Sequence, residues 1–338
     1  MSTPNLAAVN RLTEDAGFGP VDELIPLAGG ANNRVYRVVA GCGDAVLKCY
    51  FRHPDDPRDR LGAEFAFTRF AWAAGVRDVT EPLACDPANA IALYAFVNGA
   101  RPTASDVTEE LVGQATEFVR ELNAARWRPR AARLPLASEA CFSIAEHLGT
   151  VARRVERLAQ AKDPAASEFV RQELVPAWQE VHAACERDAR KCGLPLERAL
   201  GEGSRCLSPS DFGFHNVVLQ PSGRARFIDF EYAGWDDPAK LICDFFCQPA
   251  VPVPARHFES FTAAVATGFP EPDAVAARAR LLLPVYRLKW VCIRLNEFLP
   301  VGTRRREFAL PPAKLEYRRR RQLADARAAL QHAERVAA

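Results

Sequence analysis

The sequence predicts a two-lobed α+β fold, in which a small N-terminal β-sheet lobe with one helix precedes a larger, mainly helical C-terminal lobe. The chain has 338 residues and a mass of 37.3 kDa, which is long for one ordinary domain. Short apolar runs and turns fill the part before Gly99, whereas helical periodicity dominates after it. We therefore place the lobes at residues 1–97 and 98–338.

In the N-terminal lobe, β-like runs cover residues 21–27, 34–40, 45–50 and 91–97. The second and third runs are separated by Gly41-Cys42-Gly43, which favours a hairpin. Residues 61–74 carry apolar side chains at helical spacing. Together these patterns predict a small, five-stranded type of sheet packed by one helix.

In the C-terminal lobe, residues 105–124 indicate a helix, with Ser105 as the N-cap and acidic residues in the first turns. The Arg-, Pro- and Ala-rich residues 126–140 indicate a loop. Short strand-like runs follow at 205–207, 216–219 and 224–230, and helices are expected from residue 240 onward.

Composition narrows the class of function. Basic and acidic residues number 44 and 42, so no global field favours a nucleic acid or a membrane partner. The N-terminus lacks the apolar centre of a signal peptide, and no apolar run approaches membrane-spanning length. The 10 cysteines contain no C-x-x-C, and Cys243 and Cys247 lack a second ligand pair, so free thiols are favoured over zinc. We expect a cytoplasmic monomer or homodimer.

The chemistry-bearing segment runs from Cys206 to Glu231. Asp211 precedes Asn216 by five positions, and two strand-like runs then lead to Asp229. A loop with an acid and an amide, a hairpin and a second acid can converge on one point. One carboxylate can then take the proton of an attacking hydroxyl, while the amide and the other carboxylate hold Mg²⁺ on phosphates. The alternative is that these residues only cap turns or end a strand.

This segment resembles the catalytic and metal-binding loops of the aminoglycoside phosphotransferase and choline kinase families, which are relatives of the protein kinases. Their pattern is H-x-D-x-x-x-x-N, a hairpin, and then a hydrophobic residue followed by I-D-x-E/D. The resemblance implies a protein-kinase-like fold, ATP and Mg²⁺ as cofactors, Asp211 as the catalytic base, and Asn216 and Asp229 as metal ligands. The downstream Trp235-Asp236-Asp237-Pro238, with Asp244, is similar to the D-P-x-x-D signature of these families.

The sequence departs from the family pattern at Pro209, where a histidine is expected two residues before the base. In the family, that histidine mainly braces the loop, so its loss concerns loop geometry more than chemistry. His215 is a usual occupant of its own position, and we do not expect it to replace the missing histidine.

The N-terminal half is expected to bind the nucleotide. Residues 27–37 resemble the loop that covers the nucleotide, with Gly29, Gly30 and Asn33 as candidates, although the same residues suit an ordinary hairpin turn. An inward Lys48 would be costly without an anion. By resemblance it grips the α- and β-phosphates and pairs with Glu64; alternatively, both side chains are solvated. The candidates for backbone contacts to adenine, in the hinge, are Tyr94 and Phe96.

The acceptor is read less directly from the sequence. Candidate contacts are Glu231, Trp235, Asp236, Trp290 and Glu297. Trp235 suits a wall for a cationic headgroup or packing of the lobe, and Trp290 suits either pocket or core. The basic runs at 304–306 and 318–321 are interpreted as a solvated helix face.

The leading hypothesis is an ATP-dependent kinase for a hydroxyl group of a sugar, amino alcohol or aminoglycoside-like metabolite. A pseudokinase-like module, which binds nucleotide without transferring phosphate, is the alternative. A protein kinase ranks low because D-F-G and a segment ending in A-P-E are missing after Asp229.

Overall fold

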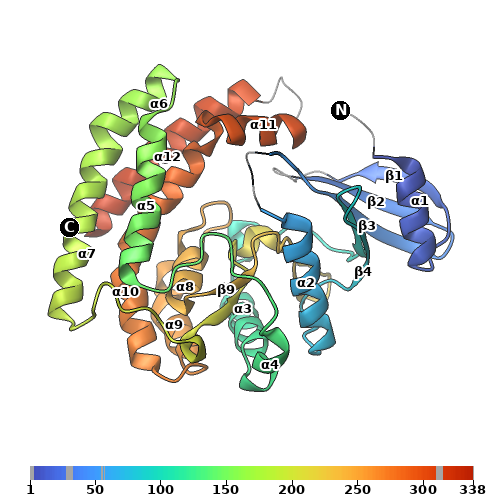
Figure 1. Cartoon of the computed structure of the whole chain (residues 1–338), viewed down its shortest axis with the longest axis horizontal. Helices are drawn as coiled ribbons and strands as arrows, with labels where there is room; N and C mark the ends of the chain where they lie inside the picture. Colours follow the sequence, from blue (N-terminus) through green and yellow to red (C-terminus); the bar gives the residue numbers. More distant parts are fainter. Residues whose placement is uncertain (1–3, 28–32, 55, 57, 310–314, 338) are drawn as a thin grey trace.

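The structure is a computed structural model that describes residues 4–27, 33–54, 56, 58–309 and 315–337. Two lobes are visible in Figure 1, with the β-sheet lobe in blue and the helical lobe from green to red. The five strands of the sheet are antiparallel and lie in the order β1-β2-β3-β5-β4. Their bounds are β1 (Val21–Pro26), β2 (Arg34–Ala40), β3 (Gly43–Cys49), β4 (Pro82–Asp86) and β5 (Ile91–Ala95).

The sheet is covered by a different helix on each face, because side chains alternate along its strands. Ala45 and Leu47 of β3 join the cluster that α1 (Leu6–Asp15) buries. Val46 packs on the other face, with the cluster that contains Leu61 of α2 (Arg60–Ala73). Alternation therefore places Lys48 on the α2 face of the sheet.

Helix α1 differs from the expectation of a single helix in this lobe. Asn5 caps it by accepting a hydrogen bond from the Ala8 amide, and the helix buries Ala8, Val9 and Leu12. The polar character of the first residues hides this narrow apolar stripe, which explains why the sequence pattern does not reveal it.

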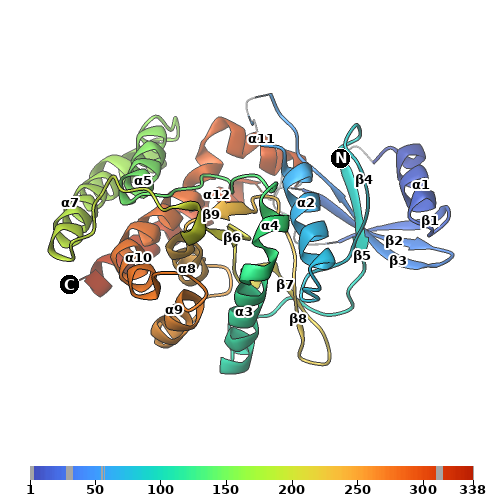
Figure 2. The same ribbon diagram turned by 60° about the horizontal axis from the view of Figure 1, so that its bottom comes forward.

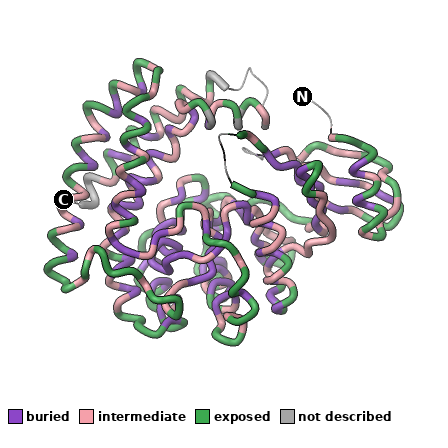
Figure 3. Tube along the Cα trace, in the orientation of Figure 1, coloured by how far each residue is buried: buried purple, intermediate pink, exposed green. Residues whose placement is uncertain are grey.

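The helical lobe is built around α10 (Pro272–Arg294), which packs against α5, α7, α8, α9 and α12. The buried residues of the helical lobe, purple in Figure 3, form one continuous core. The other helices are α3 (Glu109–Leu122), α4 (Arg128–Ala131), α5 (Ile144–Ala159), α6 (Pro164–Phe169), α7 (Val175–Lys191), α8 (Pro238–Cys247), α9 (Phe258–Ala266), α11 (Pro300–Ala309) and α12 (Leu315–Ala337). Two short hairpin-like sheets pair β6 (Cys206–Ser208) with β9 (Gly234–Asp236) and β7 (Val217–Leu219) with β8 (Ala225–Phe227).

Several local boundaries differ from the sequence prediction. The main helix of residues 105–124 is α3, and its N-cap is Thr108, whose hydroxyl accepts from the Leu111 amide at 3.2 Å. Ser105 belongs instead to a separate short turn over Ala104–Asp106. Strand β9 is only three residues long, which is too short to produce a period-two signal. The predicted loop at 126–140 contains the single-turn helix α4.

The segment that joins the lobes is fixed to the β7–β8 hairpin. Ala100 and Leu219 exchange two backbone hydrogen bonds, of 3.0 and 2.8 Å. A Cβ atom at Gly99 would lie 2.4 Å from the Leu219 carbonyl oxygen, so the chain can approach this closely only with glycine. Figure 2 shows α2 between the sheet and the large lobe. The ring of Phe67 in this helix packs at a tilt against the ring of Phe230, with 4.7 Å between the ring centroids.

Two whole-chain expectations can be compared with the structure. All ten cysteines are free thiols. Among the residues that the structure describes, no helix is both long enough and apolar enough to cross a bilayer.

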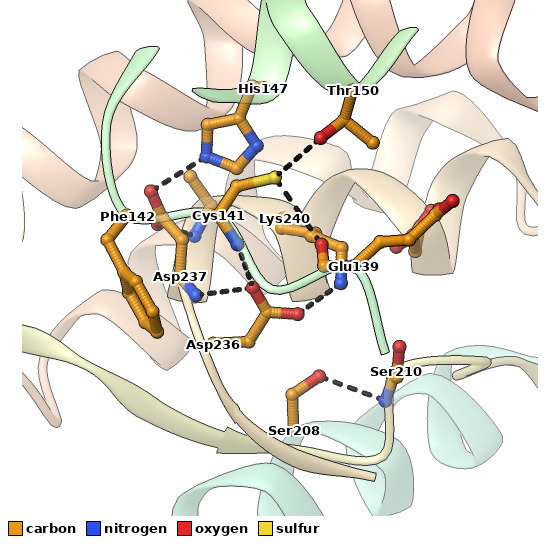
Figure 4. Close-up of polar contacts among 12 residues, drawn as sticks. Glu139, Cys141, Phe142, His147, Thr150, Ser208, Ser210, Asp236, Asp237 and Lys240 are labelled. Carbon is orange, nitrogen blue, oxygen red and sulfur yellow. Dashed lines mark hydrogen bonds and ion pairs between the residues drawn. The ribbon is translucent and has the colours of Figure 1, made fainter. Parts of the chain in front are cut away.

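A buried polar network supports the segment that follows the β7–β8 hairpin (Figure 4). Asp237 caps α8 by accepting from the Ala239 amide at 2.7 Å, and its carboxylate also meets Arg278 and His147. The His147 ring contacts Asp237 at 3.1 Å and the Tyr286 hydroxyl at 2.7 Å. Burial alone would lower the pKa of His147, but the hydrogen bonds and charges of Asp237 and Cys141 together outweigh burial and raise the pKa to about 9.

This network predicts that the protein loses stability in mild alkali. In the unfolded chain His147 titrates near 6.5, whereas in the folded chain its pKa is about 9. The stabilisation from the protonated ring is therefore complete below about pH 6.5 and is lost as pH rises through about 9. We expect the free energy of unfolding to fall by up to about 3 kcal/mol over this range. Urea unfolding at several pH values measures it.

The control for this prediction is His147→Gln, in which the amide keeps a donor near Asp237 but cannot titrate. Groups that do not contact His147 are the same in both proteins, so the difference between the two pH profiles reports on His147 and its partners. Identical slopes between pH 6.5 and 9 in the variant and the parent would contradict the assignment.

Candidate functional site

The candidate catalytic loop connects β6 to β7 and is held by its own hydrogen bonds. Ser210 has a φ of 66°, and its amide donates to the Ser208 hydroxyl at 3.0 Å. The Asn216 side-chain amide donates to the Asp211 carbonyl oxygen at 3.0 Å. Between them, the rings of Phe212 and Phe214 pack against Phe245 in the core. These contacts brace the loop although Pro209 cannot supply the family's histidine.

His215 contacts the candidate base, a contact that the sequence does not predict. Its Nε2 atom lies 3.2 Å from Oδ1 of Asp211, which is four residues earlier in the chain. Burial would raise the pKa of Asp211, but the charge and hydrogen bond of His215 outweigh burial and lower it. Burial would likewise lower the pKa of His215, and Asp211 raises it instead. Asp211 is therefore ionised near neutral pH, with a side chain that is 30% exposed.

The candidate metal ligands meet at the end of the β7–β8 hairpin. The Ile228 amide donates to the Asn216 carbonyl oxygen at 3.0 Å, which ties Asp229 to the catalytic loop. Asp229 has a φ of 69°, in the left-handed region that few non-glycine residues occupy and that often marks functional sites. Both side chains line the same cavity as Asp211.

The chemistry of these oxygens fits Mg²⁺. Carboxylate and amide oxygens are hard ligands, and Mg²⁺ in kinases is held by one or two protein side chains, substrate phosphates and water. Within the described residues, no group of three or more His, Cys, Asp or Glu side chains is placed to hold a metal. This protein would therefore contribute Asp229 and Asn216, and the remaining ligands would come from phosphate and water.

Lys48 joins the two lobes at this point. Its ammonium lies 2.6 Å from Glu64 Oε2 and also forms an ion pair with Asp229. Burial would lower the pKa of Lys48, but the charges of Asp229 and Glu64 outweigh burial and raise it. The ion pair expected between Lys48 and Glu64 is therefore present, and Tyr50 adds a hydroxyl hydrogen bond to Glu64 at 2.9 Å.

A second bridge between the lobes was not expected from the sequence. The Asn33 side-chain amide donates to Glu231 Oε2 at 2.6 Å, and its oxygen accepts from the Phe51 amide. Arg60 reaches the same Glu231 carboxylate at 2.8 Å and Asp56 at 2.7 Å. The side chain of Arg60 is 1% exposed, and its position after the N-cap Asp59 is the only sequence signal for it.

The other nucleotide candidates are placed as follows. Gly29 and Gly30 lie outside the described residues. The Tyr94 side chain is buried, and its hydroxyl lies 2.9 Å from that of Tyr50. The guanidinium of Arg37 lies 4.7 Å from the centre of the Phe96 ring. Both side chains are thus occupied elsewhere, and a contact between this hinge and adenine would use the backbone.

A cavity of about 1900 Å³ extends from Asp211, Asn216 and Asp229 to the C-terminal helices. Trp290 and Glu297 line it, as the sequence predicts for acceptor contacts. Arg318 and Arg321 also line it, which corrects the interpretation of residues 318–321 as a purely solvated face.

Three residues predicted to contact the acceptor do not line this cavity, so the prediction is wrong for them. Glu231 is held between Asn33 and Arg60. The indole nitrogen of Trp235 donates to the Ala131 carbonyl oxygen at 3.0 Å, so this ring packs within the lobe. Asp236 is fully buried and forms an ion pair with Lys240 in the network of Figure 4.

Comparisons with known proteins agree with this arrangement. The sequence model of the "Phosphotransferase enzyme family" matches residues 23–277. A comparison with curated protein sequences finds none that matches.

Among solved structures, the chain is similar to a choline/ethanolamine kinase family protein from Mesorhizobium loti, with 20% identity and a TM-score of 0.60 over 96% of this chain and 94% of that one. A choline kinase from Streptococcus pneumoniae matches with 12% identity and a TM-score of 0.56 over 96% and 98%. A spectinomycin phosphotransferase in complex with ADP and spectinomycin matches with 12% identity and a TM-score of 0.55 over 96% and 98%.

At these identities the solved structures show a shared fold, and they confirm the protein-kinase-like architecture predicted from the sequence. The family match covers most of the chain, including the catalytic loop, the hairpin and the segment with Asp237 and Asp244. The chain therefore belongs to the phosphotransferase enzyme family, as the resemblance to aminoglycoside phosphotransferases and choline kinases indicated.

Proposed function

We propose that this phosphotransferase is an ATP-dependent kinase that moves the γ-phosphate onto a hydroxyl group of a small molecule. The observation that carries the proposal is the meeting of the two lobes at one cavity: Asp211 and Asp229 line it, and Lys48 of the small lobe forms an ion pair with Asp229. Lys48 contacts Asp229 directly, and Asn216 bonds to the backbone of Asp211 at 3.0 Å. Base, metal ligands and phosphate-binding cation are thus adjacent.

Each side chain has a distinct task in the proposed reaction. Asp211 is ionised, so it orients the acceptor hydroxyl and accepts its proton. Lys48 exchanges part of its contact with Asp229 for the oxygens of the α- and β-phosphates, while Glu64 keeps its ammonium in place. When bound at Asp229 and Asn216, Mg²⁺ offsets the negative charge of the phosphates.

The size of the cavity admits several classes of small acceptor. About 1900 Å³ is ample for a metabolite, and the Trp290 and Glu297 side chains lie along its wall. A sugar, an amino alcohol or an aminoglycoside-like compound each fits this volume. The structural relatives named for choline, ethanolamine and spectinomycin support a hydroxyl acceptor. A cytoplasmic location, where ATP is abundant and thiols stay reduced, accords with ten free cysteines.

The alternative is a module that binds nucleotide without transferring phosphate. Pro209 favours this reading, because it removes the family's bracing histidine. The hydrogen bonds from Ser210 to Ser208 and from Asn216 to Asp211 replace that brace, so they favour the kinase.

Asp211→Asn separates the two functions. The amide has the same shape and keeps a partner for His215, but it cannot accept the hydroxyl proton. We expect turnover to fall by at least about a hundredfold, with MgATP affinity nearly unchanged. Steady-state kinetics on an accepted substrate, together with calorimetric titration of MgATP, measures both. A loss of less than about tenfold in turnover would rule out Asp211 as the base.

Asp229→Asn tests the metal site. Asparagine tolerates the left-handed backbone that a φ of 69° requires, so the hairpin should keep its shape. Loss of the charged oxygen should weaken MgATP binding by at least about tenfold, which corresponds to about 1.4 kcal/mol. Calorimetric titration with and without Mg²⁺ gives the comparison. Equal MgATP affinities in parent and variant would show that Asp229 is not a metal ligand.

A further inference from the structure

The end of the cavity beside α5 places two arginines on one carboxylate. Glu139 bonds to Arg154, with a distance of 3.1 Å from Nε, and Arg157 lies 3.8 Å from its other oxygen. All three side chains line the cavity. Burial lowers the pKa of Arg157, and the positive charges of Arg154, Arg153 and Arg58 lower it further. The negative charge of Glu139 offsets only part of this effect. One carboxylate thus serves two crowded guanidinium groups, and a positive charge is left over.

A similar arrangement lies between α10 and α12. Arg294 lies 3.5 Å from Asp325, and Arg321 lies 3.8 Å from the same carboxylate oxygen. The Arg294 side chain is only 17% exposed, so its charge is weakly solvated. These three residues also line the cavity. A second surplus positive charge therefore faces the same space.

Arg287 adds a third cation. It lines the cavity, and within the described part of the chain it forms no ion pair with a carboxylate. Its neighbour Lys289 is already committed to Asp244, at 2.9 and 3.0 Å.

The carboxylates at this end of the cavity cannot serve a cationic ligand as they stand. Asp244 holds Lys289 and the indole N–H of Trp290 at 2.8 Å. Glu297 is only 3% exposed and forms an ion pair with Arg318. Among the lining residues that the structure describes, nine Lys or Arg side chains face seven Asp or Glu side chains, and two of those acids are Asp211 and Asp229. A choline- or aminoglycoside-like cation would meet surplus guanidinium groups.

We propose that the hydroxyl acceptor of this enzyme carries a negative charge, as a carboxylate or a phosphate group. The planar guanidinium fork matches both groups, which can accept two parallel hydrogen bonds from one arginine. The anion binds at the arginines of α5, α10 and α12 while a hydroxyl elsewhere in the molecule reaches Asp211. This inference rests on the proposed kinase function and defines the substrate class of the same site.

The test compares matched neutral, anionic and cationic hydroxyl compounds. Glucose is set against gluconate and glucose 6-phosphate, and glycerol against glycerate and glycerol 3-phosphate, with choline and kanamycin as cations. ADP release and mass spectrometry of the product report transfer, and the rise in Tm without ATP reports binding. We expect kcat/KM of the better anion to exceed that of its neutral parent at least about tenfold, the size of one charged contact. The two anion series separate a carboxylate site from a phosphate site.

Two variants remove one surplus guanidinium each without stranding a carboxylate. Arg157→Gln leaves Glu139 paired with Arg154, and Arg321→Gln leaves Asp325 paired with Arg294. Their side chains are 57% and 67% exposed, so both variants should fold. At least one should raise KM for the anion about tenfold with little change in kcat, and should lose its Tm shift. Arg153→Gln is the matched control, because Arg153 is exposed on the same helix and outside the cavity lining.

Transfer to choline, kanamycin or the neutral parents as efficiently as to the anions would overturn the proposal. The proposal would also fail if the anions neither raised Tm nor stimulated ADP release. It would fail as well if Arg153→Gln raised KM for the anion, and reduced the Tm shift, as much as both cavity variants. Failure of the underlying kinase function appears differently: no compound becomes phosphorylated, and Asp229→Asn leaves MgATP affinity unchanged. In that case the Tm shifts of the anions, and their loss in Arg157→Gln or Arg321→Gln, still decide whether an anion site exists.

Discussion

A buried ammonium that must find anions determines the arrangement of this molecule. Lys48 leaves β3 on the face that α2 covers, where an unpaired charge would be prohibitively costly. Glu64 from α2 and Asp229 from the β7–β8 hairpin meet it, so one side chain joins the sheet, the helix and the large lobe. Helix α2 packs into both lobes, and the clamp from Asn33 through Glu231 to Arg60 closes beside it. The candidate site residues Lys48, Glu64 and Asp229 are brought together by the same charges that join the two lobes.

The elements that the sequence predicts best are those with a long or repeated signal. Alternation in β2 and β3, helical spacing in α2 and the Asp211–Asn216–Asp229 pattern all correspond to observed elements and contacts. The missed elements have weak or hidden signals, such as the three-residue β9 and the narrow apolar stripe of α1. Glu231, Trp235 and Asp236 were misplaced because a polar or aromatic residue near a catalytic motif looks the same whether it faces a ligand or a buried partner. Only tertiary contacts, with Arg60, Ala131 and Lys240, distinguish these cases.

The charge of the cavity separates this chain from the ligands named for its structural relatives. Choline is a cation and would be favoured by unpaired carboxylates or open aromatic faces. Here Glu139 and Asp325 are each shared by two arginines, and Trp290 is turned to Asp244. A shared fold does not require a shared acceptor, because phosphoryl transfer depends on the groups around the γ-phosphate, whereas specificity depends on the far end of the cavity.

The fate of the γ-phosphate tests the central claim most directly. A ³¹P NMR time course of the protein with MgATP and an anionic hydroxyl compound follows every phosphorus atom at once. Our account predicts that the γ resonance of ATP disappears as ADP and a new phosphomonoester resonance grow in equal amounts, and that chelation of Mg²⁺ stops both. ATP that persists unchanged with every acceptor, or ADP that forms only together with inorganic phosphate, would contradict it.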